Sequence, residues 1–146
     1  MIKMTEQIRN LLNSALADGT PCLVGTSTKD GHPQISPKGS VVAFNDDTLC
    51  YWERSGRSAL KRVSENPHVV VFFRNAARAK EIPYRGGVMR FYGDARVLTD
   101  GADRDKVWEL IPEAERKPDP EKKGAAVLVR LDRIEEISGN IIMQRD

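Results

Sequence analysis

One stretch, Thr48 to Pro67 (TLCYWERSGRSALKRVSENP), constrains the fold of this chain more than any other. It opens with residues that favour a pleated strand, Leu49 to Trp52, and continues from Arg57 to Val63 with the spacing of a short amphipathic helix. Ser55 is a suitable N-cap, and Pro67 cannot continue the helix. The stretch therefore predicts a strand, a tight turn and a helix of about two turns.

The N-terminus of this predicted helix is a candidate anion site. Free backbone N–H groups and the positive end of the helix dipole meet there, and Arg57 adds a guanidinium, which together suit a terminal phosphate. Tyr51 and Trp52, at the end of the preceding strand, could place an aromatic wall beside it. On this stretch alone a solvated basic helix is the more frequent alternative, because short local motifs often match by chance.

The length and charge of the chain bound the class of protein. At 146 residues it is expected to form one domain, residues 1–146, which buries about 70% of the surface of its unfolded form. No apolar run approaches the roughly 20 residues that span a bilayer, and the N-terminal sequence MIKMTEQIRN lacks the apolar core of a signal peptide. A net charge of +2 with interspersed signs argues against a nucleic-acid surface. We therefore expect a cytoplasmic protein that binds neither membranes nor nucleic acid.

The cysteine and histidine patterns do not predict a metal centre. Cys22 and Cys50 are isolated, each in a strand-like run, without C-x-x-C spacing or a nearby pair of histidines. Reduced, buried thiols that act as small hydrophobic groups are expected. His32 and His68 both flank prolines in predicted turns, so neither is a strong candidate for an axial ligand.

The predicted strand before this stretch is interrupted at Pro37 and Gly39. Proline cannot donate to a sheet ladder, and glycine tolerates the geometry of a bulge. A bend that frees backbone amides is therefore predicted in the segment Ser36, Pro37, Lys38, Gly39 and Ser40. Lys38, directed away from the sheet, is either a second cation for an anion or a lysine that guards an exposed edge.

The remaining segments predict a mainly β protein. His68 to Phe73 is a continuous apolar run that predicts a central strand buried on both faces, and Val88 to Leu98 alternates as a half-exposed strand should. The other predicted elements are a helix capped by Thr5 that ends at Asp18-Gly19, a hairpin from Cys22 to Ile35, a strand from Val41 to Phe44, a loop from Asn75 to Gly87, a helix from Asp103 to Ile111, an exposed loop from Glu113 to Lys123, and strands at 125–131 and 133–138. About seven strands without a repeated strand-helix-strand pattern favour an antiparallel Greek-key barrel over a doubly wound sheet.

Three of these segments together resemble a known family. The residues HPQISPKGS, YWERSGRSALKRVSENP and VVVFF are similar to those of the FMN-binding split-barrel proteins related to pyridoxamine 5′-phosphate oxidase. The likeness covers about Leu11 to Leu98 and, more weakly, Ala125 to Ser138. It implies a mainly β split barrel with short helices, a homodimer, and FMN bound in clefts between the two chains.

The resemblance also implies a set of cofactor-binding residues. Arg57 and Ser58 match the family's phosphate-binding Arg-Lys pair, with serine in place of the lysine, and Ser55 belongs to the same turn. Tyr51 and Trp52 match the pair that lies along the flavin. The segment that runs past the polar edge of the flavin ring is matched by Ser36, Pro37, Lys38, Gly39 and Ser40. On the strand that faces the flavin of the other subunit, the matching residue is Arg90.

The function implied is that of an FMN-dependent oxidoreductase with an unidentified small-molecule substrate. No catalytic residue is assigned, because the flavin carries the hydride chemistry and needs no protein acid or base. The family's oxidases carry an arginine at the position of Ser36, a lysine near Val41 and a basic C-terminal segment with a tryptophan. This chain instead ends in GNIIMQRD, so oxidation of pyridoxamine 5′-phosphate itself is not expected. The alternatives are a relative that binds a deazaflavin or haem, and a flavin-binding module without turnover.

Overall fold

The structure is a computed structural model that describes residues 1–54 and 57–146, without the side chain of Arg57. Within these residues the strands are β1 (Cys22–Ser27), β2 (Pro33–Lys38), β3 (Val42–Ala43), β4 (Thr48–Glu53), β5 (His68–Arg74), β6 (Val88–Leu98), β7 (Ala125–Glu135) and β8 (Ile141–Gln144). The helices are α1 (Glu6–Asn13), α2 (Arg57–Glu65), α3 (Ala102–Leu110) and α4 (Glu113–Arg116), and two 3-10 turns, η1 (Ala76–Arg78) and η2 (Arg85–Gly87), lie between β5 and β6.

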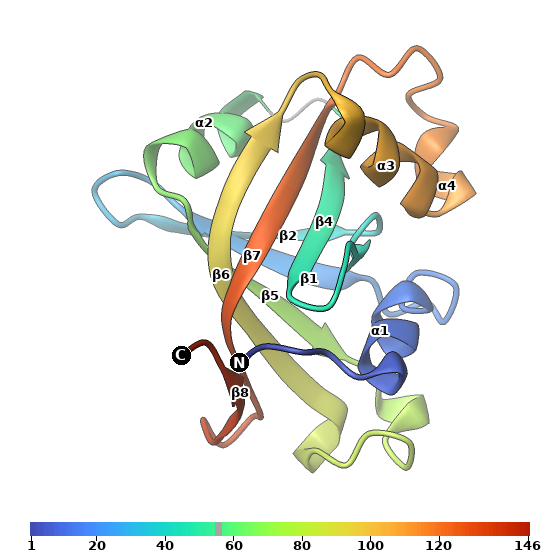
Figure 1. Ribbon diagram of the computed structural model, residues 1–146, viewed down its shortest axis with the longest axis vertical. Coiled ribbons are helices and arrows are strands. Elements are labelled where there is room, and N and C mark those ends of the chain that lie inside the picture. Colours follow the sequence, from blue (N-terminus) through green and yellow to red (C-terminus); the bar gives the residue numbers. More distant parts are fainter. Residues whose placement is uncertain (55–56) are drawn as a thin grey trace.

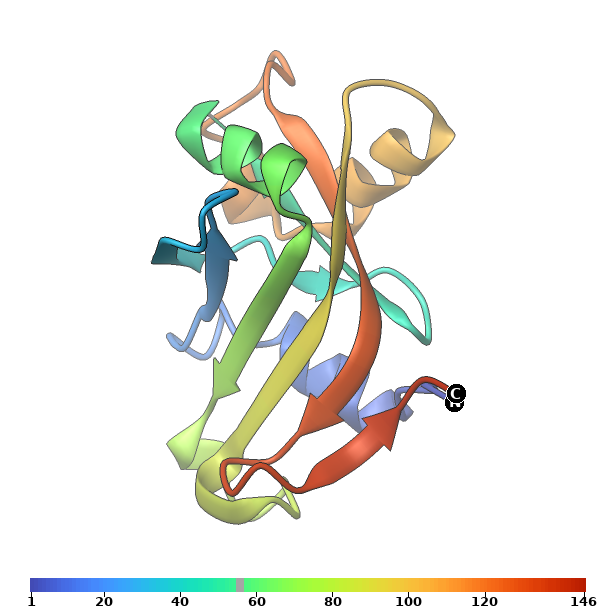
Figure 2. The same cartoon turned by 90° about the vertical axis from the view of Figure 1, so that its left-hand side faces the viewer.

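All of these strands belong to one antiparallel, strongly curled sheet. Its strand order is β2-β1-β5-β6-β7-β4-β3, and β8 pairs with β7 outside this path. The long strands β6 and β7 run along most of the height of the molecule, and the sheet wraps from its β2 edge round toward β4 (Figure 1, Figure 2). This architecture confirms the prediction of an antiparallel split barrel with short helices.

The helices cover the ends of the curled sheet. Figure 1 shows α2, α3 and α4 near one end of the sheet, while α1 packs beside β3. As predicted, Thr5 caps α1: its Oγ1 accepts a hydrogen bond from the N–H of Ile8 at 3.2 Å. At the other end of α1, Asn13 Oδ1 accepts a hydrogen bond from the N–H of Ala43 at 3.0 Å, which ties the helix to β3. None of the described helices is long and apolar enough to cross a membrane.

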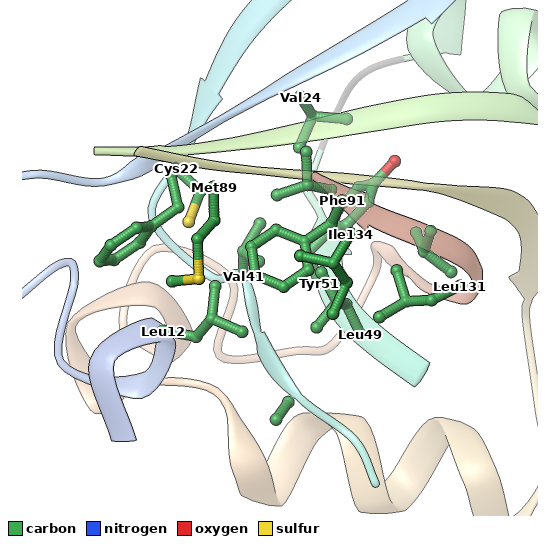
Figure 3. Close-up of a cluster of buried hydrophobic side chains, with 14 of the residues drawn as sticks. Leu12, Cys22, Val24, Val41, Leu49, Tyr51, Met89, Phe91, Leu131 and Ile134 are labelled. Carbon is green, nitrogen blue, oxygen red and sulfur yellow. The ribbon is translucent and has the colours of Figure 1, made fainter. Parts of the chain in front are cut away.

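Apolar side chains fill the inside of the sheet (Figure 3). Phe91 of β6 and Leu131 of β7 lie in one buried cluster with Leu12 of α1. A second cluster lies on the opposite side of β4, under α3, where the rings of Trp52 and Trp108 meet edge to face with their centroids 4.8 Å apart. β4 is therefore buried on both faces, one by the barrel core and the other by α3.

The bend predicted at residues 36–40 begins later than the sequence indicates. Residues 36 to 38 still pair with β1, with Pro37 opposite Leu23 and Lys38 as the last residue of the strand. Proline is tolerated here because β2 is an edge strand, where a missing N–H need not break a ladder on the outer side. The bend itself comprises Gly39 and Ser40, before β3.

The prediction that β5 is buried on both faces is wrong within this chain. Val69, Val71 and Phe73 point into the core and are at most 5% exposed. The alternate residues Val70 and Phe72 are only half-buried and lie on the outer face of the sheet. The continuous apolar run therefore marks an outer face that the rest of the described chain does not cover.

The C-terminal part of the sheet also differs from its prediction. The two strands predicted at 125–131 and 133–138 are one continuous strand, β7, because a bulge replaces the expected turn. Opposite Tyr92 and Gly93 the register shifts by one residue, which leaves Asp132 as the extra residue. β8, which the sequence did not predict, pairs with the second half of β7. The exposed loop predicted at 113–123 begins instead with the short helix α4.

The bulge generates a prediction at Gly93. A Cβ atom at this residue would collide with the carbonyl oxygen of Arg130 and lie 3.0 Å from Cγ1 of Val129. We expect Gly93→Ala to lower the free energy of unfolding by about 1–3 kcal/mol, because the backbone of the bulge would have to move. The control is Asp94→Ala, at the exposed next position, which should change it by less than about 1 kcal/mol. Urea unfolding measures both, and equal midpoints for the two variants would contradict the close packing.

Candidate functional site

The bend after β2 and the end of β4 are joined by one serine hydroxyl. Ser40 Oγ accepts a hydrogen bond from the backbone N–H of Trp52 at 2.9 Å and donates one to the carbonyl oxygen of Trp52 at 3.2 Å. On its other side Trp52 pairs with β7, whereas β3 pairs only with residues 49 and 50 of β4. The buried hydroxyl of Ser40 therefore provides hydrogen-bond partners for the N–H and the carbonyl oxygen of Trp52, at the edge of β4 that β3 does not reach.

A second contact between the same segments is a shielded ion pair. Lys38 Nζ lies 2.6 Å from Glu53 Oε2, and the two side chains are 19% and 7% exposed. Removal of one partner of such a pair strongly destabilises the folded protein, because the other charge stays shielded from water without a counterion. Lys38 is therefore already paired with Glu53, and its roles as a cation for a ligand or as a guard of the edge strand β2 stay predictions.

The bend and the end of β4 enclose a small polar pocket of about 200 Å³, which we call the bend pocket. It is lined by Pro37, Lys38, Gly39, Ser40, Trp52, Glu53, Arg54 and Glu115. Glu115, from α4, lies so close to Gly39 that a Cβ atom there would collide with its carboxylate. The structure therefore brings together four of the five predicted bend residues, while Ser36 pairs with Val24 and does not line the pocket.

The rings of Tyr51 and Trp52 do not form the open aromatic wall that the sequence suggested. Tyr51 lies in the barrel core at 2% exposure, and burial raises the pKa of its hydroxyl (Figure 3). Trp52 is 3% exposed and packs under α3 against Trp108. The rings of both residues are buried within the chain itself, so a ligand would meet the end of β4 chiefly through its backbone. The assignment of these two residues to cofactor binding stays a prediction.

The predicted phosphate residues follow directly after this strand end. Ser55 and the side chain of Arg57 lie outside the described residues. α2 begins at Arg57 as predicted, and Ser58, the second residue of the helix, is exposed. The start of α2 therefore comes only three residues after Arg54, which lines the bend pocket.

An apolar hollow of about 370 Å³ lies on the outer face of the sheet, and we call it the outer-face hollow. It is lined by Leu23, Gly25, Ile35, Val70, Phe72, Arg90 and Tyr92. Ile35, on the edge strand β2, is 70% exposed. Successive residues of a strand alternate between faces, so Ile35 and Pro37 lie on the same face of β2, about 7 Å apart. The outer-face hollow and the bend pocket therefore follow one another along one strand.

Arg90 lies at the end of this hollow, and its guanidinium already has partners. Arg90 Nη1 donates hydrogen bonds to Glu135 Oε1 and to the carbonyl oxygen of Glu136, both at 3.2 Å. Arg90 Nη2 donates to the carbonyl oxygen of Ile137 at 3.2 Å. Arg90 therefore anchors the turn between β7 and β8 against β6. The structure places it on the predicted strand but does not bring it to the bend pocket.

Sequence analysis missed Asp119, which supports the site from the loop after α4. Its Oδ2 accepts a hydrogen bond from Trp52 Nε1 at 2.9 Å, and its two oxygens also accept from the N–H groups of Lys123 and Gly124. Burial alone raises the pKa of Asp119, but the hydrogen bonds of Trp52, Gly124 and Lys123 and the charge of Arg104 outweigh it, so that the pKa is lowered. The only sequence signal was an acidic residue between two prolines.

Other parts of the described chain offer less to a ligand. A larger hollow of about 770 Å³ lies between the N-terminal residues and the turn before β4. Its arginine, Arg9, is already bonded to Asp46 Oδ1 at 2.8 Å and to the carbonyl oxygen of Met4 at 2.6 Å. Among the described residues, no three His, Cys, Asp or Glu side chains are grouped closely enough to hold a metal ion.

Comparison with known protein families gives a match over most of the chain. A sequence model of the pyridoxamine 5′-phosphate oxidase family matches residues 4–137. No curated protein matches the chain significantly. The matched region contains the bend, the end of β4 and α2, and it extends through β6 and β7.

Several solved structures share the fold. HupZ of Group A Streptococcus is 24% identical, with a TM-score of 0.68, over 96% of this chain and 99% of that protein. A candidate pyridoxamine 5′-phosphate oxidase from Lactobacillus delbrueckii is 19% identical, with a TM-score of 0.67, over 92% and 95% of the two chains. An FMN-binding protein from Syntrophomonas wolfei is 16% identical, with a TM-score of 0.64, over 88% and 87%. At such low identities these likenesses establish the fold alone.

The contacts of Asp119 generate a prediction about stability and its pH dependence. We expect Asp119→Asn to lower the free energy of unfolding by about 1–3 kcal/mol at neutral pH, because charge-assisted hydrogen bonds are lost. The pKa of Asp119 is lowered in the folded chain. Its stabilising contribution is therefore complete above the ordinary carboxyl pKa and is lost as the pH falls through the lowered value.

Urea unfolding of both proteins at neutral pH and at about pH 3 checks this expectation. The difference between wild type and Asp119→Asn should shrink in acid. Asp100→Asn, at an exposed position, is the control and should behave like wild type at both values. A difference that grows in acid would contradict the lowered pKa.

Proposed function

Because the chain belongs to the pyridoxamine 5′-phosphate oxidase family, we propose that it binds FMN and acts as an oxidoreductase on a small molecule. When bound, FMN supplies hydride chemistry that no amino-acid side chain provides. The role of the protein is then to bind the cofactor, to orient it and to limit access of water.

The observation that carries the proposal is that an apolar hollow and a polar pocket follow one another along β2. The outer-face hollow at Ile35 is mostly apolar, and the bend pocket at Pro37 is polar. FMN combines the same properties, because its large flat ring favours apolar cover and the edge of the ring is polar, while its phosphate would lie beyond the bend pocket, at the start of α2. Ligand sites of this kind combine apolar walls with a few placed polar groups.

The start of α2 is the proposed phosphate site. Free N–H groups at the helix N-terminus, the guanidinium of Arg57 and the hydroxyl of Ser58 would hold the phosphate, and Ser55 belongs to the same turn. This helix has nine residues, which is long enough to carry a dipole of useful size. Arg54, exposed at the end of β4, adds a positive charge nearby.

The bend is the proposed contact for the polar edge of the flavin ring. In this proposal the backbone of Ser36, Pro37, Lys38, Gly39 and Ser40 faces that edge, with the backbone of Tyr51 and Trp52 beside it. The hydroxyl of Ser40 holds the bend in place through the backbone of Trp52. The charge of Lys38 is balanced by Glu53, so the ring edge would meet mainly backbone groups and a neutral ion pair.

The buried thiols near the site do not offer an alternative nucleophile. Burial raises the pKa of both Cys22 and Cys50 to about 12. A thiol with such a pKa is protonated at neutral pH, and only the thiolate is an effective nucleophile. Covalent catalysis by either cysteine therefore does not compete with flavin chemistry as an account of this site.

We also propose that the outer-face hollow is covered by a second copy of the chain. Val70 and Phe72 extend an apolar surface from β5, and Ile35 adds a large exposed side chain at the edge. Closed two-fold assembly is the commonest arrangement of soluble oligomers and buries the same patch on both subunits. Arg90 would then lie at the border of this interface, near the flavin bound by the partner.

The test of cofactor binding is a pair of titrations, with FMN and with riboflavin, at one fixed ionic strength. Arg57→Ala should weaken FMN binding about ten- to a hundred-fold, equivalent to about 1.5–3 kcal/mol, because a charge-assisted bond to phosphate is lost. Riboflavin binding should hardly change, since riboflavin has no phosphate. The matched control is Lys61→Ala on the same helix, which removes a 76% exposed cation and should alter neither affinity.

Equal losses for both ligands would mean that Arg57→Ala damages the fold, and no loss would refute the phosphate site. The absorption spectrum of the purified protein separates the other cofactors, because flavin, deazaflavin and haem absorb differently. Bound flavin without turnover of any reductant would identify a flavin carrier.

Light scattering tests the proposed pairing. Ile35→Glu should convert the protein into monomers at micromolar concentration, because it places a charge in the proposed apolar interface. Ile141→Glu is the matched control, since Ile141 on β8 is also a large exposed residue, at 48%, but does not line the hollow. A monomeric wild type with flavin bound, or dissociation in both variants, would contradict the proposal.

A further inference from the structure

A further hollow, of about 580 Å³, lies beside the end of β4, between α2 and α3. Its cations come from three separate parts of the chain: Arg54 after β4, Arg104 on α3, and the pair Lys122 and Lys123 before β7. Leu60 of α2 and Ala125 of β7 add apolar surface. We call it the basic hollow. A volume of this size is within the usual range for small-molecule sites.

The acidic groups around the basic hollow are already engaged. Glu53, which also lines it, pairs with Lys38. Asp119 faces Arg104, but it accepts hydrogen bonds from Trp52 and from two backbone N–H groups. Glu121 pairs with Lys123 at 2.9 Å, where both side chains are more than two-thirds exposed and the attraction is weak. Within the described residues, Arg54, Arg104 and Lys122 form no ion pair, so the hollow keeps a net positive charge.

The guanidinium of Arg104 is held in place by several contacts with the protein. Arg104 Nη2 donates hydrogen bonds to the carbonyl oxygens of Lys122 at 2.6 Å and Gly124 at 3.1 Å. Its guanidinium lies over the ring of Trp52, 4.8 Å from the centroid. Arg104 Nε is buried and has no hydrogen-bond partner among the described residues. A buried N–H without an acceptor is costly.

The loop that carries the two lysines is equally fixed. The carboxylate of Asp119 accepts hydrogen bonds from the N–H groups of Lys123 and Gly124. Lys122 adopts the left-handed backbone conformation, with a φ of 54°. Gly124 approaches β4 so closely that a Cβ atom there would collide with the carbonyl oxygen of Glu53. The positions of these backbone groups are therefore set before any ligand arrives, which lowers the entropy lost on binding.

We propose that the basic hollow binds the phosphate groups of a phosphorylated small molecule, as a second ligand in addition to FMN. Several cations from different elements suit a ligand with two or more negative charges, whereas the site at α2 is expected to hold a single phosphate. Leu60 and Ala125 give apolar cover to the rest of the ligand. That this ligand exchanges electrons with FMN rests on the proposed function, whereas the binding itself does not.

Inorganic pyrophosphate is the probe that tests this site. It is titrated into 15N-labelled protein, with and without saturating FMN, at one fixed low ionic strength because salt screens exposed charges. We expect the amide signals of Lys123 and Gly124 to shift in both titrations, because these residues line the basic hollow alone. Lys122→Gln/Lys123→Gln should weaken pyrophosphate binding by about tenfold or more and leave FMN binding unchanged.

Lys29→Gln/Lys61→Gln is the charge-matched control, because both lysines are exposed and neither lines the basic hollow. Equal weakening in the two double variants would overturn the proposal, since only net charge would then matter. Loss of pyrophosphate binding on addition of FMN would also overturn it, because the hollow would then be part of the FMN site. If FMN does not bind at all, the proposed function fails, but the titration without FMN still decides whether the basic hollow is an anion site.

Discussion

The unpaired edge of β4 is the constraint on which the site depends. β7 pairs with this strand along its whole length, but β3 covers only residues 49 and 50 on the other side. The peptide groups of Trp52 still need partners, and the hydroxyl of Ser40 supplies them. This requirement draws the bend against the end of β4 and places Lys38 within reach of Glu53. The bend pocket is thus a consequence of how a short strand leaves an edge open, rather than a separate structural addition.

The sequence predicted the elements of this arrangement better than their contacts. Local periodicity was sufficient for β6 and for the start of α1, because side chains of one element repeat with a fixed spacing. It could not show that the rings of Tyr51 and Trp52 are buried, since alternation gives opposite faces without saying what covers each of them. The contact between Trp52 and Asp119 joins residues 67 positions apart, and no local pattern encodes such a distance. Phosphate binding at Arg57 and FMN itself remain predictions.

The error at β5 is informative about the surface of the molecule. A continuous apolar run normally means that both faces of a strand are buried. Here the inner residues are buried, whereas Val70 and Phe72 remain half-buried on the outer face. The composition of β5 is therefore that of a strand buried on both faces, although the described residues of the chain cover only its inner face. A second copy would supply the missing cover, and it would place the same apolar hollow beside the edge strand β2 of its partner.

The ion pair between Lys38 and Glu53 affects the two hollows in the same way. Glu53 lines both the bend pocket and the basic hollow, so an unpaired carboxylate there would repel an anion from either side. Because Lys38 Nζ lies 2.6 Å away, the pair is close to neutral, and the potential in each hollow is set by the remaining charged side chains. Arg54 belongs to both hollows, while Arg104, Lys122 and Lys123 belong to the basic hollow alone. In the bend pocket the charge of Arg54 is offset by Glu115, whereas the basic hollow keeps an excess of positive charge, which favours an anionic group there.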